Sequence, residues 1–272
     1  MEGGIHVAIK AEQLTSWLGI PITNTLLMSW VVIAVLLLIA VSVRFHLSVI
    51  PSKFQLLLEL MVENVMEFIE TTLESKELAR RYFPLITTIF LFIFTANVLE
   101  FIPGVGSIGF LAREAVAAAS ESAAMLGAAP HLEFIPLLRS MNTDLNVTLA
   151  LAIISFLVIE ISGILMIGFF KYFSRFVPFG AFRHGIGNGL IALFVGVIEF
   201  VSELIRLISF SFRLFGNIFA GEVLLAVVTF FVPFIIPVPF MAFEVFVGFM
   251  QAAIFSLLTL FFIKLAVTDT AH

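Results

Sequence analysis

Long apolar runs separated by short polar segments predict several membrane-spanning helices. Residues 25–46 form the first span, residues 82–102 the second and residues 144–170 the third. Each run meets the ~20 apolar residues needed to cross a bilayer. Pro84 lies in the first turn of the second span, where a helix tolerates proline. Residues 1–24 are an N-terminal segment ahead of the first span, and no cleavable signal peptide is evident in them.

The last part of the chain is almost continuously apolar. Residues 185–232 contain neither proline nor a polar turn cluster, so they predict a helix of roughly 70 Å. That length is more than twice the thickness of the hydrocarbon core. The helix must therefore lie strongly tilted or break, most plausibly near Gly216 or Gly221. A proline-rich turn at 233–240 then leads into a closing helix at 241–267.

An amphipathic helix is predicted at residues 53–79, between the first and second spans. Its acidic residues recur every three or four positions, which places them on one face with Leu, Met and Val on the other. A solvated face is one interpretation of these acids, and a protein-docking surface is the other. The acidic residues are Glu59, Glu63, Glu67, Glu70 and Glu74.

Basic residues predict the orientation. They are more frequent between the first two spans and in the loop at 171–184 than in the loop at 103–143. The positive-inside rule therefore places the N-terminus outside and the C-terminus in the cytoplasm. Within the outer loop, the alanine-rich stretch 114–126 predicts a short helix. The basic residues that were compared are Arg44, Lys53, Lys76, Arg80 and Arg81, then Arg113 and Arg139, then Lys171, Arg175 and Arg183.

Composition supports an all-α integral membrane protein of about five to six hydrophobic helices, the last two long and strongly tilted. Hydrophobic residues make up 61% of the 272 residues and charged residues only 12%. Soluble domains contain about twice as many charged residues, so a soluble enzyme is excluded. A net charge of -5 does not support nucleic-acid binding. The absence of cysteine removes disulfides and thiolate metal sites, and no cofactor or metal is expected.

Polar side chains in the last two predicted helices are the candidates for chemistry. At ~100° per residue, five of them fall within a stripe about 80° wide on the long helix. Glu222 faces elsewhere, and Glu244 shares one face of the closing helix with Gln251. Ionisable groups inside a membrane cost several kcal/mol each and usually face a water path or a partner charge. The stripe contains Glu199, Glu203, Arg206, Arg213 and Asn217.

Each candidate also has a structural interpretation. Glu199, Glu203 and Arg206 have spacings that allow local pairing, so they could form a structural charge cluster. Arg213 has no acid within four positions and cannot pair locally on its own helix. Glu160, inside the third span, is either an inter-helix hydrogen-bonding group or part of a route for ions.

Four segments resemble the sequences of one membrane-protein family. Arg213–Glu222 reads Arg-Leu-Phe-Gly-Asn-Ile-Phe-Ala-Gly-Glu and closely resembles the signature of subunit a of F-type ATP synthases. The stretch Thr143–Ala152 is similar to the entry of that family's third span. Asn97–Pro103 and Gln251–Phe255 also fit, and the resemblance covers roughly residues 20–267.

The resemblance implies a stator of the membrane sector, facing a rotor ring of c subunits. In this family, the stator couples proton flow to rotation of the ring and hence to ATP synthesis. It implies that Arg213 is the essential arginine. The residues implied to line two aqueous half-channels are Glu199, Asn217, Glu222, Glu244 and Gln251, and the supporting polar residues are Glu203, Arg206, Glu160 and Asp144.

The same resemblance implies the setting of the chain. Its expected partners are the c ring, the b subunits of the peripheral stalk, the soluble ATPase head and the lipid bilayer. The expected location is a bacterial cytoplasmic membrane, and the chain would be no enzyme by itself because it holds no nucleotide site. Two positions depart from some branches of the family. Glu244 stands where those branches have His, which makes the polar relay carboxylate-based, and Leu207 stands where others have proline.

Two other classes of protein are alternatives. In a secondary proton-coupled transporter, the polar stripe would bind a solute between repeats, but the sequence shows no internal repeat and no second pair of broken helices. In a purely structural membrane scaffold, a locally unpaired arginine such as Arg213 would have no purpose.

Overall fold

The computed structural model describes residues 11–17, 20–113, 132–176 and 186–268. The helices are α1 Asn24–Phe45, α2 Lys53–Leu73, α3 Lys76–Leu99, α5 Leu145–Ile167, α6 Phe169–Phe176, α7 Ile186–Phe231 and α8 Pro237–Thr268, with a 3-10 turn, η1, at Met141–Thr143. The strands are β1 Gln13–Trp17, β2 Ile20–Thr23, β3 Pro103–Gly106, β4 Gly109–Arg113 and β5 Leu132–Pro136. They form two antiparallel hairpins, β1 with β2 and β4 with β5.

The fold is that of an all-α integral membrane protein, as the apolar pattern predicts. Within the described residues, α1, α3, α5 and α8 are long and apolar enough to cross a bilayer. Large apolar side chains such as Leu38 on α1 and Ile161 on α5 are more than half exposed. Such surfaces are stable against lipid tails rather than water.

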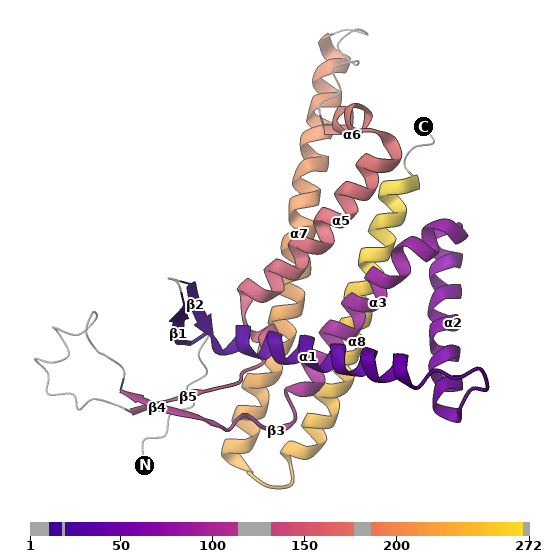
Figure 1. Ribbon diagram of the computed structural model, residues 1–272. Coiled ribbons are helices and arrows are strands. Elements are labelled where there is room, and N and C mark those ends of the chain that lie inside the picture. The colour runs from indigo at the N-terminus through magenta and orange to yellow at the C-terminus, as the bar shows by residue number, and fades with distance from the viewer. Residues whose placement is uncertain (1–10, 18–19, 114–131, 177–185, 269–272) are drawn as a thin grey trace, which may run out of the picture.

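Helix α7 extends unbroken over 46 residues, through both Gly216 and Gly221. Its length is about 70 Å at the usual helical rise. Figure 1 shows α3, α5, α7 and α8 side by side, with α1 crossing them at a steep angle. Helices that cross in this way cannot all stand upright in one membrane. Of the two sequence alternatives for residues 185–232, the break near Gly216 or Gly221 is wrong, and the strong tilt stays a prediction.

The core lies where α3, α5, α7 and α8 meet. Phe210 of α7 packs against Phe255 and Phe262 of α8, with ring centroids 5.0 and 5.7 Å apart. Ala152 of α5 and Ala252 of α8 are fully buried beside them. Small residues at these positions let the helices approach closely, as is usual between membrane helices. The core therefore fixes α7 by one face and leaves its other face exposed.

The predicted amphipathic helix at 53–79 is wrong in its end, because two helices share this segment. Helix α2 ends at Leu73, and Glu74 adopts a left-handed conformation with φ of 55°. Ser75 then caps α3, its hydroxyl accepting a hydrogen bond from the Leu78 N–H. The two local signals reverse the chain although the apolar periodicity continues.

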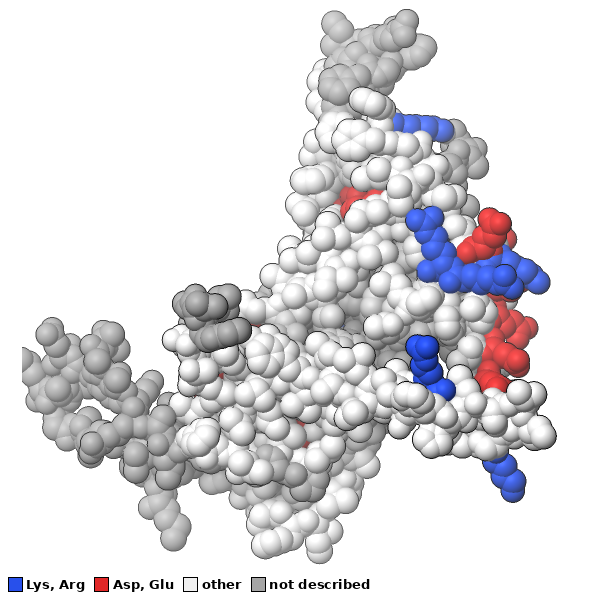
Figure 2. Space-filling model, viewed as in Figure 1, with Lys and Arg blue, Asp and Glu red and all other residues white. Residues whose placement is uncertain are grey.

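The acids of α2 lie on an exposed side of the molecule. Figure 2 shows charged side chains gathered over α2 and the start of α3, while most of the remaining visible surface is uncharged. Only Gln55, Ile69 and Leu73 of α2 are buried, so the helix docks by its last turns. Lys264 of α8 donates a hydrogen bond of 2.8 Å to Glu74 beside these turns. This hydrogen bond and the ammonium charge hold the pKa of the Glu74 carboxyl below its usual value.

Three other predicted boundaries differ from the structure. Helix α8 begins at Pro237, inside the predicted turn at 233–240, because proline in a first turn lacks only an N–H that has no helical partner. The third span ends at Ile167, since Gly168 adopts φ of 89° and α6 follows. The outer loop at 103–143 contains β3, β4, β5 and η1. Its alanine-rich stretch at 114–126, with the short helix predicted there, lies outside the described residues.

Candidate functional site

Arg213 lies on the exposed side of α7, among apolar side chains. Phe212 and Ile208 beside it are each about half exposed. The guanidinium donates a single, long hydrogen bond of 3.4 Å to the hydroxyl of Ser209, one turn earlier. Among the described residues, Arg213 has no ion-pair partner. An arginine stays protonated in any protein environment, so this surface presents a permanent positive charge.

The predicted stripe on α7 lies along the border between its buried and exposed faces. Glu203, at one edge, is only 5% exposed, whereas Arg213 at the other edge is exposed. Arg206 lies between them and places its guanidinium 3.9 Å from the ring centre of Phe262. Glu199 and Asn217 are half-buried. The stripe therefore runs from a packed end to an open middle rather than along one uniform surface.

Three carboxylates gather around a small gap in the C-terminal part of α7. Glu222 of α7, Glu244 of α8 and Glu100, directly after α3, line this gap together with Asn97 of α3. Glu244 is 7% exposed, and it makes no hydrogen bond or ion pair with any other described residue. We call Glu100, Glu222 and Glu244 the carboxylate cluster.

Glycines let the carboxylate cluster form. A methyl group on Gly221 of α7 would overlap the Glu244 carboxylate, so only glycine admits that carboxylate against the α7 backbone. At Gly248 of α8, a methyl group would lie 2.8 Å from Cβ of Asn97. Asn97 uses this close approach to donate a hydrogen bond of 3.0 Å to the Gly248 carbonyl, and it accepts one of 2.6 Å from Asn142. These hydrogen bonds thus hold α3 against α8 beside the carboxylate cluster.

Arg139 is an ion-pair partner of the carboxylate cluster. It lies between β5 and η1, and its side chain is 7% exposed. Its Nε and one terminal nitrogen donate to the two oxygens of Glu222 over 3.3 and 3.0 Å. A bidentate contact of this kind fixes the geometry as well as the charge of the carboxylate. Arg139 belongs to the predicted outer loop at 103–143 and has no predicted role in a site.

A second group of polar side chains lies toward the N-terminal end of α7. Glu160 of α5 accepts a hydrogen bond of 2.6 Å from the hydroxyl of Tyr172 on α6, while its other oxygen is buried without a hydrogen-bond partner. The Tyr172 ring covers Gly163, where a methyl group would lie 2.5 Å from it. Phe176 of α6 packs edge-on against Phe200 of α7. Glu160 thus lies in the part of the molecule where α6 meets α7 at Phe200, the residue after Glu199.

Two other predicted residues are buried in the helix packing. Gln251 is 4% exposed, and its amide nitrogen has no hydrogen-bond partner among the described residues. Asp144 caps α5 by accepting from the Asn146 N–H at 2.9 Å, and it also accepts from the hydroxyl of Thr25 at 2.9 Å. Asp144 therefore joins the start of α5 to the start of α1.

Neither Glu100 nor Arg139 is among the site residues predicted from the sequence. Glu100 lies inside the predicted second span at 82–102, and an ionisable residue in such a position is itself a signal for function. Arg139 gave no comparable signal, because its partner Glu222 is 83 residues away. Helical periodicity contains no information about contacts at that separation.

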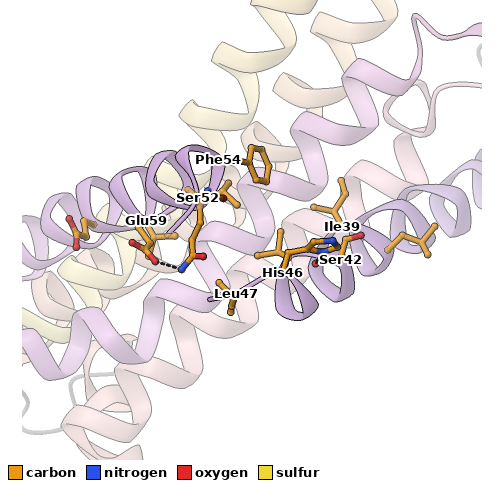
Figure 3. A pocket seen from close by; sticks show the side chains of 13 residues that line it. Ile39, Ser42, His46, Leu47, Ser52, Phe54 and Glu59 are labelled. Atoms are coloured by element: carbon orange, nitrogen blue, oxygen red, sulfur yellow. Dashed lines mark hydrogen bonds between the residues drawn. The ribbon is translucent and has the colours of Figure 1, made fainter. Parts of the chain in front are cut away.

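A wide pocket lies apart from all of these residues. It has a volume of about 900 Å³ and opens between the end of α1 and the start of α2. In Figure 3, Ser42 and His46 of the α1 side and Phe54 and Glu59 of α2 border it, and a hydrogen bond of 2.8 Å joins Gln55 to Glu59. None of the predicted site residues lines this pocket.

Along α7, the exposed Arg213 separates two groups of polar side chains. Glu203 and Glu222 lie roughly 15 Å from it along the helix axis, in opposite directions. The fold and this arrangement define a multi-pass membrane protein with ionisable side chains buried between its helices.

Comparisons with known proteins identify its family. Residues 26–264 match the model of the family described as ATP synthase A chain. ATP synthase subunit a of Campylobacter concisus (strain 13826) is 29% identical over 88% of this chain and 87% of its own length. The subunit a of Sulfurihydrogenibium sp. (strain YO3AOP1) is 31% identical over 89% and 98%, respectively. The chain belongs to the ATP synthase A chain family, that of subunit a of F-type ATP synthases.

Proposed function

We propose that this chain is the stator that couples proton flow to rotation of a c ring, with Arg213 as its essential residue. The observation that supports this role most directly is the exposure of Arg213. A permanent charge on an apolar helix face, with Ser209 as its one hydrogen-bond partner among the described residues, is costly in a membrane unless a partner covers it. A ring of subunits that each present a carboxylate is a partner of the required chemistry.

The mechanism follows from the cost of burying charge. A c-subunit carboxylate stays protonated while it faces lipid, because the charged form is far too costly there. It ionises where the stator offers water and a positive charge, and Arg213 supplies that charge. Because Arg213 does not release its own proton, it blocks direct passage between the two half-channels. A proton that enters from one side must therefore bind a c-subunit carboxylate and be carried by rotation of the ring before it leaves on the other side.

The polar side chains on either side of Arg213 are assigned to the two half-channels. Glu222, Glu244, Asn217 and Gln251 belong to the outer one, and Glu199 to the inner one, with Glu203, Arg206, Glu160 and Asp144 as supporting groups. The separation of the two groups along α7 supports this assignment. In the same proposal, the membrane is the bacterial cytoplasmic membrane, with the N-terminus outside and the C-terminus inside.

The proposed partners are the c ring, the b subunits of the peripheral stalk and, through the complex, the soluble ATPase head. ATP would be made on the head, and this chain would hold no nucleotide site. Co-purification from mild detergent tests the partners. A ring of small hydrophobic subunits and a soluble ATPase should accompany the chain, whereas a secondary transporter would be recovered without them.

The Arg213→Ala variant tests the assigned role. In membrane vesicles, proton-driven ATP synthesis should be lost while the soluble head still hydrolyses ATP, because the charge that ionises the ring carboxylate is absent. Arg213→Lys should also be a poor substitute, since a buried ammonium can lose its proton. The matched control is Ser209→Ala, which removes the one hydrogen-bond partner of Arg213 but keeps the charge. ATP synthesis by Arg213→Ala above a tenth of the unmodified rate would overturn the role.

A further inference from the structure

The carboxylate cluster contains one member that is paired and one that is not. Glu222 shares both of its oxygens with Arg139. Glu244, across the gap, has no hydrogen-bond or ion-pair partner among the described residues and is almost fully buried. The two acids therefore respond differently to a proton, although they line the same gap.

Protonation of Glu222 would remove the ion-pair partner that Arg139 has among the described residues. The Arg139 side chain is 7% exposed, so water cannot replace the lost carboxylate charge. Breaking a buried pair by neutralising one partner is strongly unfavourable, and arginine cannot respond by losing a proton. Protonation of Glu244 has the opposite effect, because it removes a buried negative charge that pairs with no cation among the described residues.

We propose that Arg139 is a positioning residue that holds Glu222 as a fixed anion, so that Glu244, with Glu100, exchanges the protons in this cluster. The inference rests on the proposed function and assigns different roles to Glu222 and Glu244 within the outer half-channel. Glu244 accepts a proton from water as a carboxylate and releases it to the next acceptor as a neutral acid. Glu222 keeps its charge throughout, and its pair with Arg139 holds the β5–η1 connection against α7.

Four charged groups from separate parts of the chain lie at or beside this gap. Glu100 after α3, Glu222 on α7 and Glu244 on α8 line it, and Arg139, before η1, is the ion-pair partner of Glu222. Removal of the Arg139 charge takes away the single cation among them in the described residues. The remaining carboxylates then repel one another more strongly and hold protons to a higher pH.

The first test measures potential-driven proton uptake by the complete complex in liposomes. Glu222→Gln should lower uptake at least tenfold, because it leaves the buried Arg139 without its ion-pair partner. The double variant Arg139→Gln with Glu222→Gln replaces an ion pair by two amides that can bond to each other, and uptake should return to within threefold of the unmodified complex. Glu244→Gln should lower uptake at least tenfold both alone and in the double-variant background.

The second test is the pH profile of uptake, which a merely structural role would not move. Arg139→Gln should shift the half-maximal pH upward by about half a unit or more. Arg139→Lys retains a cation but not the bidentate geometry, and it should shift the profile less than Arg139→Gln does. The inference is overturned if the double variant transports or assembles no better than Glu222→Gln alone. It is equally overturned by an unshifted profile in Arg139→Gln, or by uptake within threefold of normal in Glu244→Gln.

The proposed function can fail separately. ATP synthesis by Arg213→Ala would overturn the stator role whatever the Arg139 variants do. Loss of synthesis in Arg213→Ala, together with an unrescued double variant, would overturn only the division of labour within the carboxylate cluster.

Discussion

Gly221 shows how much of the site depends on a single missing methyl group. The Glu244 carboxylate packs directly on this glycine, where a Cβ atom would overlap it. Gly221→Ala should displace Glu244 from the cluster and lower proton-driven ATP synthesis at least threefold, because the end of the Glu244 side chain must move away from the added methyl. The matched control is Gly187→Ala on the same helix, where nothing lies within 4 Å of the added methyl. Equal rates for the two variants would contradict this packing role.

At the residue scale, the sequence predicted what depends on neighbours along the chain. Arg213 stood out because no acid lies within one helical turn, and the structure leaves it without an ion-pair partner among the described residues. Glu222 and Glu244 were candidates because each interrupts an apolar helix, and they line one gap. The ion pair of Arg139 with Glu222 was not predictable, since it depends on how β5 and η1 fold back onto α7.

At the scale of elements, the contact between α2 and α8 should respond to charge. Lys264→Gln removes the hydrogen bond and the charge that lower the Glu74 pKa. Because that pKa is lowered, the contribution of this contact is present at neutral pH and is lost as the pH falls through the lowered value. Lys264→Gln should therefore speed amide hydrogen exchange in the last turn of α2 at pH 7.

The same experiment at acid pH provides the check. At a pH below the lowered pKa of Glu74, the unmodified chain and Lys264→Gln should exchange at similar rates, because Glu74 is then protonated in both. Lys76→Gln is the matched control, since Lys76 pairs with Glu70 at 3.4 Å and is largely exposed. Such exposed pairs contribute little. An unchanged exchange rate in Lys264→Gln at pH 7 would contradict the docking role.

Helices were predictable as elements because length and apolar content decide them, but their ends were not. The reversal at Glu74 and Ser75 depends on one left-handed residue and one hydroxyl cap, neither of which interrupts the apolar period. The hairpin of β4 with β5 was missed for another reason. Its strands are short and separated along the chain, and pairing rather than alternation defines them.

At the scale of the whole molecule, the chain alone should be nearly proton-tight. Acids of α7 lie on both sides of Arg213 along the helix axis. Glu203 and Glu222 are each roughly 15 Å away from it. A fixed positive charge between them repels a proton that passes directly. Dye-reported proton uptake under an imposed potential should be slow for the chain alone and fast after addition of a c ring.

The control for this measurement is a ring whose carboxylate is chemically blocked, which should restore the slow rate. Fast uptake by the chain alone would reveal a continuous channel and would favour a transporter over a stator. The overall architecture that leads to this expectation was only partly predictable. The length of the apolar segment 185–232 predicted a tilted or broken helix, but the crossing of α1 over the bundle depends on contacts with α3 and η1 that the sequence does not encode locally.

The Arg139–Glu222 pair also has a consequence for biosynthesis. Arg139 leaves the ribosome 83 residues ahead of its counter-charge. At ~5–20 residues per second, it waits for about 4–17 s before Glu222 exists. During this interval, an arginine that is buried in the finished protein must stay at the water interface, because insertion without its partner is too costly. The connection between β5 and η1 is thus set in place only after most of α7 has been synthesised, and a nascent chain that stops short of residue 222 leaves that end of the molecule open.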